Sequence, residues 1–168
     1  LAAKECKKNN GINDYEYVKK VAEELGQARP TAVNLSWALS KMVTLAQNCD
    51  PAELFNVLIK GAQDIHRADL DDNQKMGKIG AELIKGESNI LTHCNAGALA
   101  TSGYGTALGV VRKAFENGCI KKIYTTETRP WFQGSRLTAS ELLHDGLGVI
   151  IIVDSASGFL MKSKKIDW

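Results

Sequence analysis

The sequence predicts an α/β fold, and two observations carry that prediction. Up to about Gly86, apolar residues recur at helical spacing, whereas after Gly86 short apolar runs alternate with helical segments. Apolar strands that alternate with helices are typical of a parallel sheet covered on both faces. We therefore expect a helical segment of an N-terminal domain over 1–86. The first part of a Rossmann-like domain, with helices flanking a parallel sheet that is incomplete at the C-terminus, is expected over 87–168.

The first part is predicted to consist of three long helices. Asn13 or Asp14 can cap the first helix, and Pro30 ends it because a proline disfavours helix at the residue before it. Asp50 followed by Pro51 reads as an N-cap with proline at the first helical position. The helices are expected at about 14–27, 32–48 and 51–85, the last with a break near 69–72.

The second part is predicted to alternate strands with helices. Strands are expected at 89–93, 120–125 and 148–153, with a further one starting at Ile166. Helices are expected at about 99–117 and 138–145. Gly103-Tyr-Gly105 makes no dinucleotide fingerprint, since it falls inside an expected helix rather than at a first turn.

Ligands of open parallel sheets collect at the carboxyl ends of the strands, and three segments with reactive or polar residues lie there. Cys94 follows the first strand, 127–133 follows the second, and Asp154 follows the third. We expect these three loops to meet at one rim of the sheet.

Composition excludes several classes of function. With 168 residues, 44% of them hydrophobic and 24% charged, the chain has an ordinary globular composition. A net charge of +2 argues against nucleic-acid binding, and no apolar run approaches the ~20 residues of a membrane span. Four cysteines without metal-site spacing argue against zinc and against a disulfide framework, and fit a reducing cytoplasm.

Cys94 is the candidate reactive residue. Its thiol lies where an apolar strand gives way to small residues and then a helical pattern. The free N–H groups at a helix start stabilise a thiolate and can hold a phosphate, which is the chemistry of a sugar-phosphate enzyme. The competing interpretation is a small buried hydrophobic residue.

Three blocks occur in an order that resembles a known family. They are Arg29-Pro-Thr-Ala-Val-Asn-Leu, Cys94-Asn-Ala-Gly-Ala-Leu-Ala-Thr, and Glu127-Thr-Arg-Pro with Gln133-Gly-Ser-Arg-Leu-Thr-Ala. Over nearly its whole length the chain resembles the S-methyl-5-thioribose-1-phosphate isomerases of methionine salvage, which are relatives of regulatory subunits of translation initiation factor 2B. The resemblance implies that Cys94 is catalytic and that Arg29 and Gln133 contact the substrate.

Other residues near these blocks are candidates for support of the site. His93 either tunes the thiol or is a core histidine, and Asn95 directly follows the cysteine. Glu127, Arg129 and Arg136 form either an ion-pair lattice under the site or direct ligand contacts. Asp154 either lines the rim or caps the next segment.

The resemblance implies conversion of an aldose 1-phosphate to a ketose 1-phosphate without metal or organic cofactor, in a cytoplasmic homodimer. Ring opening must come first, because the anomeric oxygen carries the phosphate. Alternatives are an isomerase of a related sugar phosphate such as ribose 1,5-bisphosphate, and a non-catalytic regulatory subunit of translation initiation factor 2B type.

The family's Arg-Gly-Ala, Gly-Ala-Asp-Arg and Asn-Lys segments, the second with a catalytic aspartate, are absent from these residues. We therefore expect the 168 residues to be a fragment that is inactive alone.

Overall fold

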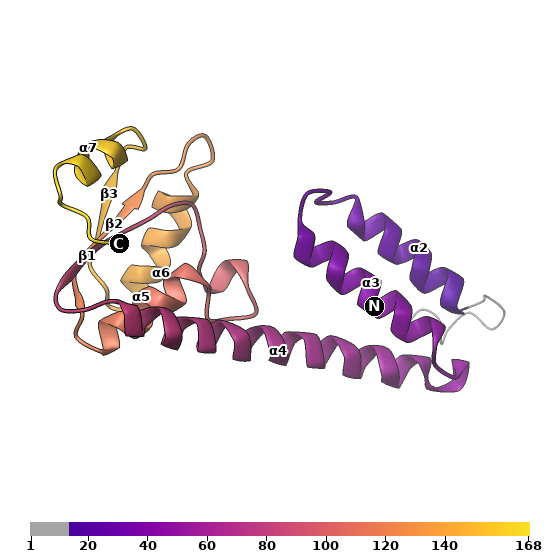
Figure 1. Cartoon of the computed structure of the whole chain (residues 1–168). Helices are drawn as coiled ribbons and strands as arrows, with labels where there is room; N and C mark the ends of the chain where they lie inside the picture. Colours follow the sequence, from indigo (N-terminus) through magenta and orange to yellow (C-terminus); the bar gives the residue numbers. More distant parts are fainter. Residues whose placement is uncertain (1–13) are drawn as a thin grey trace. The chain divides into compact units, whose positions relative to one another are not determined.

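The computed structural model describes residues 14–168. The chain divides into two compact units, Leu1–Arg67 and Ala68–Trp168, and the long helix α4 (Leu54–Leu83) belongs partly to each (Figure 1). The change of pattern at Gly86 marks the start of the sheet region; as a domain boundary it remains a prediction. None of the helices in the described part of the chain combines the length and hydropathy that a membrane span requires.

The first unit is helical, as expected. Helices α2 (Asp14–Gly26) and α3 (Val33–Gln47) pack against each other and are followed by the 3₁₀ turn η1 (Pro51–Glu53). The Asp50 carboxylate accepts a hydrogen bond from the N–H of Ala52 at 2.8 Å, which confirms the predicted cap. Capping at Asn13 lies outside the described residues. The buried apolar residues of this unit are Val18, Ala46, Leu54 and Leu58.

Helix α4 is continuous, so the break expected near 69–72 was wrong. Asn73 stabilises the helix by donating to the carbonyl oxygen of Asp69, at 2.8 Å, and to its carboxylate, at 3.2 Å. The same carboxylate accepts the N–H of Ser102 at 2.8 Å. The polar residues here therefore link the helix to a neighbouring loop and leave its backbone intact.

The second unit contains a parallel sheet, as predicted, and its strand order is β1-β2-β3. Its strands are β1 (Ser88–Thr92), β2 (Ile120–Thr126) and β3 (Val149–Ile152). No strand starts at Ile166 in the described chain, but the last residues do lie along β1. The N–H of Asp167 donates to the carbonyl of Asn89, and the N–H of Leu91 donates to the carbonyl of Trp168, both at 2.9 Å.

The helices of the sheet unit are shorter than predicted. Helix α5 runs over Ala107–Glu116 and is preceded by the 3₁₀ turn η2 (Ala98–Ala100). The helix cannot start earlier because Gly103 and Gly105 have φ values of 148° and 90°, which do not occur in helices. The π-helical turn η3 (Gly134–Thr138) leads directly into α6 (Ala139–His144).

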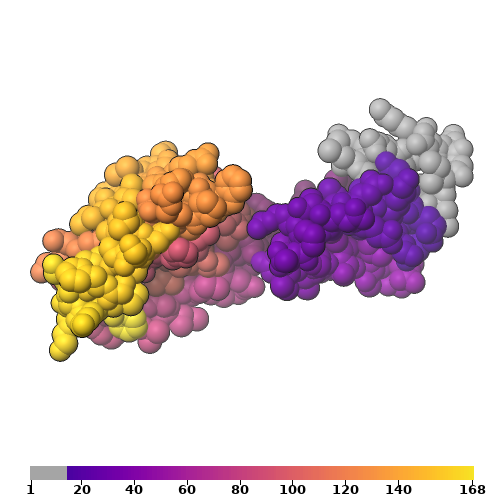
Figure 2. Space-filling view, turned by 90° about the horizontal axis from the view of Figure 1, so that it is seen from above, coloured from indigo at the N-terminus to yellow at the C-terminus, as the bar shows by residue number. Residues whose placement is uncertain are grey.

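The core of this unit lies between the sheet and helices α4, α5 and α6. The buried apolar residues that form it are Ala81, Ile84, Ile90, Leu108, Val111, Ala114, Ile123, Leu142 and Leu147. Helix α7 (Ala156–Lys162), yellow in Figure 2, follows β3 and stays at the surface, with Phe159 65% exposed. This core fixes the strand ends at which the candidate site lies.

Candidate active site

Cys94 follows β1 and has a left-handed backbone, with φ of 61°. Its N–H donates to the Thr128 hydroxyl at 2.9 Å, and its carbonyl accepts a hydrogen bond from the Thr138 hydroxyl. The side chain is partly buried. Non-glycine residues in this conformation persist only where their surroundings hold them, and they cluster at functional sites.

The loop after β2 contains two more left-handed residues, Thr128 with φ of 60° and Phe132 with φ of 59°. The Asp154 carboxylate, which follows β3, accepts the N–H groups of Thr128 and Arg129, each at 2.8 Å. The loops after all three strands are therefore joined by hydrogen bonds, which confirms the predicted convergence at one rim.

Asp154 acts here as a backbone clamp. The hydrogen bond from the Arg129 N–H lowers the pKa of the Asp154 carboxyl. Partial burial alone would raise this pKa, but the Thr128 N–H and His93 lower it further, so the net shift is downward. The ionised carboxylate therefore holds the loop after β2.

His93 is exposed, so it is no core histidine. Its Nδ1 lies 2.6 Å from the Thr126 hydroxyl, which in turn lies 2.9 Å from the Thr128 hydroxyl. The Thr128 hydroxyl accepts the Cys94 N–H. A chain of hydroxyl groups thus connects the imidazole to the backbone of the cysteine.

Gln133 has an unpaired acceptor. Its Oε1 is buried and has no hydrogen-bond partner in the described part of the protein, a property that it shares there only with Oδ1 of Asn89. A buried polar atom without a partner is costly, and a ligand donor would satisfy it. Gly134, the next residue, allows the close approach of this turn to β2, because a Cβ there would lie 1.7 Å from the carbonyl oxygen of Thr126.

The charged residues of this loop interact only weakly with one another. Arg129 Nη1 lies 4.0 Å from Glu127 Oε1, and the Arg129 guanidinium lies over the Phe132 ring at 5.1 Å. Arg136 donates to the carbonyl of Trp131 at 3.3 Å. Arg129 and Arg136 are exposed.

Sequence reasoning missed a buried carboxylate beneath the cysteine loop. Glu141 on α6 accepts hydrogen bonds from Asn95 at 3.0 Å and from the N–H groups of Ala98 and Leu99 at 2.7 and 3.3 Å. Arg112 on α5 donates to it at 3.0 Å. An acidic residue beside Leu142 on the inward face of a helix is the signal that would have identified it.

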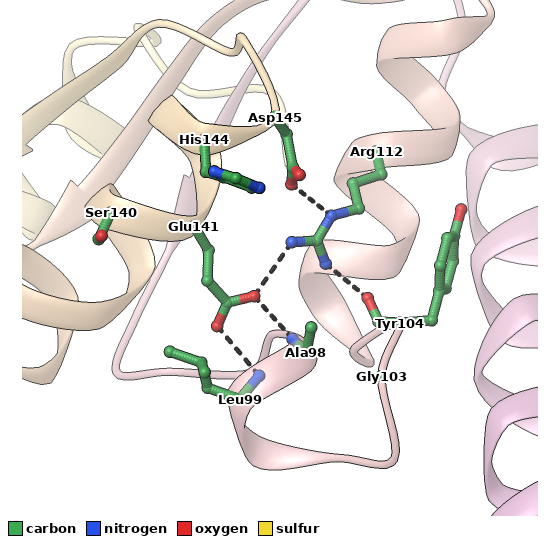
Figure 3. A pocket seen from close by; sticks show the side chains of 9 residues that line it. All are labelled: Ala98, Leu99, Gly103, Tyr104, Arg112, Ser140, Glu141, His144 and Asp145. Atoms are coloured by element: carbon green, nitrogen blue, oxygen red, sulfur yellow. Dashed lines mark hydrogen bonds and ion pairs between the residues drawn. The ribbon is translucent and has the colours of Figure 1, made fainter.

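Arg112 links this carboxylate to the rest of the unit. It also donates to Asp145 at 2.6 Å and to the carbonyl of Tyr104 (Figure 3). Burial alone would raise the pKa of Glu141, but the hydrogen bonds from Asn95 and Arg112 outweigh it and hold that pKa below its usual range. Burial would likewise lower the pKa of Arg112, and its bonds to Glu141 and Asp145 raise it instead.

The expected anion cradle after Cys94 is not free. Helix α5 begins only at Ala107, and the N–H groups of Ala98 and Leu99 are taken by Glu141. A cavity of about 620 Å³ lies beside this network (Figure 3), and neither Cys94 nor Gln133 lines it. Its lining residues are Ala98, Leu99, Gly103, Tyr104, Arg112, Ser140, Glu141, His144 and Asp145.

Arg29 lies in the helical unit, exposed between α2 and α3. Cys6 lies outside the described residues, whereas Cys49 and Cys119 are free thiols at carbonyl oxygens, those of Ala46 and Asn117. Within the described residues no group of three histidine, cysteine, aspartate or glutamate side chains has the arrangement of a metal site.

Comparison with known proteins identifies the family of the chain. The model of the initiation factor 2 subunit family matches residues 1–168. The chain belongs to this family.

The relatives of the chain include enzymes. The chain is 49% identical over 164 residues to a methylthioribose-1-phosphate isomerase of Thermotoga petrophila, covering 94% of this chain and 48% of that protein. It is also 49% identical to the enzyme of that name from Carboxydothermus hydrogenoformans, over 161 residues, which are 94% of this chain and 47% of that protein. The chain thus spans about half the length of these relatives.

Two solved structures show the same fold. The 5-methylthioribose 1-phosphate isomerase of Pyrococcus horikoshii superposes with a TM-score of 0.81 at 38% identity, over 99% of this chain and 48% of that one. The delta subunit of translation initiation factor eIF-2B from A. fulgidus superposes with a TM-score of 0.77 at 42% identity, over 92% of this chain and 46% of that one.

Proposed function

We propose that the whole protein is an aldose–ketose isomerase that converts S-methyl-5-thio-α-D-ribose 1-phosphate to S-methyl-5-thio-D-ribulose 1-phosphate in methionine salvage. The observation that carries the proposal is the constrained Cys94 at the strand rim, in a chain 49% identical to methylthioribose-1-phosphate isomerases. We further propose that the enzyme is a cytoplasmic homodimer that uses no cofactor.

The reaction makes two demands on the site. A proton must reach the ring oxygen as the ring opens, and a hydrogen must then pass from C2 to C1. We assign one proton exchange with the substrate to the Cys94 thiol, which lies at the rim of the sheet. We assign the second acid–base role to the aspartate of the family's Gly-Ala-Asp-Arg segment, which is not among these 168 residues.

Substrate binding is assigned to Gln133 and Arg29. The unpaired Oε1 of Gln133 suits a donor such as a sugar hydroxyl, which would give that buried oxygen its missing hydrogen bond. A guanidinium such as that of Arg29 suits a phosphate, with which it forms paired charge-assisted hydrogen bonds. The N–H groups of Ala98 and Leu99 already donate to Glu141, so these two groups are not available to the phosphate.

A second candidate function is that of a regulatory subunit in translation initiation. The observation that favours it is the superposition on the A. fulgidus translation factor subunit at 42% identity. A subunit that acts through protein contacts has no use for a constrained thiol, and we therefore place this function second.

Isomerase turnover by the full-length protein tests the proposal, with Cys94→Ser beside Cys119→Ser as matched control. Cys94→Ser is expected to lower kcat by ~10²-fold or more, the usual effect of losing an acid–base group, whereas Cys119→Ser is expected to keep it. A folded wild-type protein without turnover contradicts the proposed substrate. Ribose 1,5-bisphosphate and then a nucleotide-exchange assay of translation initiation factor 2 would then test the alternatives.

A further inference from the structure

Two threonine hydroxyls hold the peptide groups on either side of Cys94. The Cys94 N–H donates to Oγ1 of Thr128 at 2.9 Å, and the Cys94 carbonyl accepts from Oγ1 of Thr138. Both threonines belong to the connection between β2 and α6. The conformation of the cysteine is therefore fixed by a segment distant from it in sequence.

The left-handed conformation of Cys94 makes these contacts necessary. A residue with a Cβ is rarely stable at a φ of 61° unless specific contacts hold it there. The direction of the Cα–Cβ bond follows from the positions of N, Cα and C, so the backbone decides where the thiol can lie. Loss of either hydroxyl would free the backbone to return toward an ordinary conformation.

The two threonines are themselves held in place. Thr128 is 5% exposed and Thr138 fully buried. Asp154 accepts the Thr128 N–H at 2.8 Å, and the Thr138 hydroxyl accepts a hydrogen bond from Asn95 Nδ2 at 3.3 Å. Asp154 thus fixes the backbone of Thr128, whose hydroxyl also lies 2.9 Å from that of Thr126, and Asn95 contacts the hydroxyl of Thr138.

We propose that Thr128 and Thr138 are positioning residues for Cys94: their hydroxyls hold the left-handed backbone that directs the thiol into the rim. The effect on turnover rests on the proposed function, in which this thiol reacts. The effect on the environment of the thiol is independent of the proposed function.

Thr128→Val and Thr138→Val test the proposal in the full-length protein, since each replaces a hydroxyl by a methyl of similar shape. The matched control is Thr125→Val in β2, which removes a similarly buried hydroxyl that donates to the carbonyl of Thr126 instead of holding Cys94. We expect kcat to fall by roughly 10- to 100-fold in both test variants, with KM little changed, because displacement of a reacting group slows the chemical step. Thr125→Val is expected to retain turnover, and Thr128→Ser, which keeps the hydroxyl, to recover most of it.

The pH dependence of Cys94 alkylation by iodoacetamide, followed by mass spectrometry of the modified peptide, is the second measurement. Both valine variants are expected to shift the rate profile, whereas Thr125→Val and Thr128→Ser keep that of the wild type. Unchanged kcat and an unchanged profile in a folded valine variant overturn the proposal. If one valine variant does not fold, the other decides. If Cys94→Ser retains turnover, the proposed function fails, and the alkylation profile alone still decides positioning.

Discussion

At the scale of single residues, the rim is organised by groups that bind backbone rather than by charged pairs. Asp154 holds two N–H groups of the loop after β2, and through Thr128 this loop holds Cys94. The exposed pair of Arg129 and Glu127, with 4.0 Å between its atoms, adds little by comparison. The carboxylate of Asp154 is therefore the charge on which the rim depends.

The pH dependence of the rim follows from Asp154. Because its folded pKa is lowered, its contribution to stability is present above the usual aspartate value of about 3.9 and is lost as the pH falls through the folded value. We expect its carboxyl carbon to titrate below pH 3.9 in NMR spectra. Titration at or above that value contradicts the clamp.

Removal of the same charge gives a second measurement. Asp154→Asn is expected to speed hydrogen exchange of the Thr128 and Arg129 amides at neutral pH, since the charged acceptor of both is lost. The control Asp72→Asn removes only an exposed pair with Lys75 and is expected to leave these amides unchanged.

Cys94 and Gln133 could be proposed as site residues from the sequence because each lies in a recognisable block that follows an expected strand. Thr128 and Thr138 could not. A threonine hydroxyl has no sequence signature, and whether it meets a peptide group far along the chain depends on a turn that the pattern does not encode. For His93 the sequence supports two interpretations, and the exposure of the side chain excludes the core histidine.

At the scale of elements, the turn η3 places both Gln133 and Thr138, and it packs tightly on β2. A Cβ at Gly134 would lie 1.7 Å from the carbonyl oxygen of Thr126, so the turn cannot keep its place with any larger residue. The sequence predicted a helix from 138 but not the π-helical turn before it, since one extra residue in a turn leaves the apolar spacing almost unchanged.

Gly134→Ala is expected to lower the free energy of unfolding by about 2 kcal/mol or more, because the added methyl forces the turn away from β2. Urea denaturation measures this. Gly158→Ala in α7 is the matched control: its Cβ would meet nothing within 4 Å, and it is expected to be neutral or to stabilise by up to about 1 kcal/mol. Equal effects of the two substitutions would show that the turn tolerates displacement.

Helices α5 and α6 are joined by the ion pair of Arg112 and Glu141, whose side chains are only 13% and 8% exposed. Glu141→Gln is expected to lower the free energy of unfolding by roughly 3 kcal/mol, because Arg112 then remains largely buried with one charged partner fewer. The control Glu116→Gln removes an exposed pair with Lys113 and is expected to cost less than about 0.5 kcal/mol. A small loss in Glu141→Gln would contradict the role given to the pair.

At the scale of the whole molecule, residues 14–168 contain two separate apolar cores, one in each compact unit. The α/β class and the parallel sheet were predictable because periodicity reports which faces are buried. The continuity of α4 was not, since the acidic residues near 69–72 carry the same signal whether they end a helix or bind a neighbouring loop.

Separate cores predict separate responses to core substitutions. Leu108→Ala, at a fully buried position, is expected to destabilise the sheet unit by about 2–5 kcal/mol through loss of apolar contact and cavity formation. Hydrogen exchange should then accelerate in β1 and β2, while the amides of α2 and α3 keep their wild-type rates. Equal acceleration in both units would show that they unfold together.

The carboxylate of Glu141 beneath the cysteine loop has a consequence for ligand recognition. Where a binding loop becomes ordered only when its ligand arrives, the entropy lost in that ordering weakens the affinity. Here the anion is a side chain of the protein itself, bound to the N–H groups of Ala98 and Leu99. The loop is therefore ordered when the chain folds, and a ligand that binds beside it does not bear the entropy of ordering it.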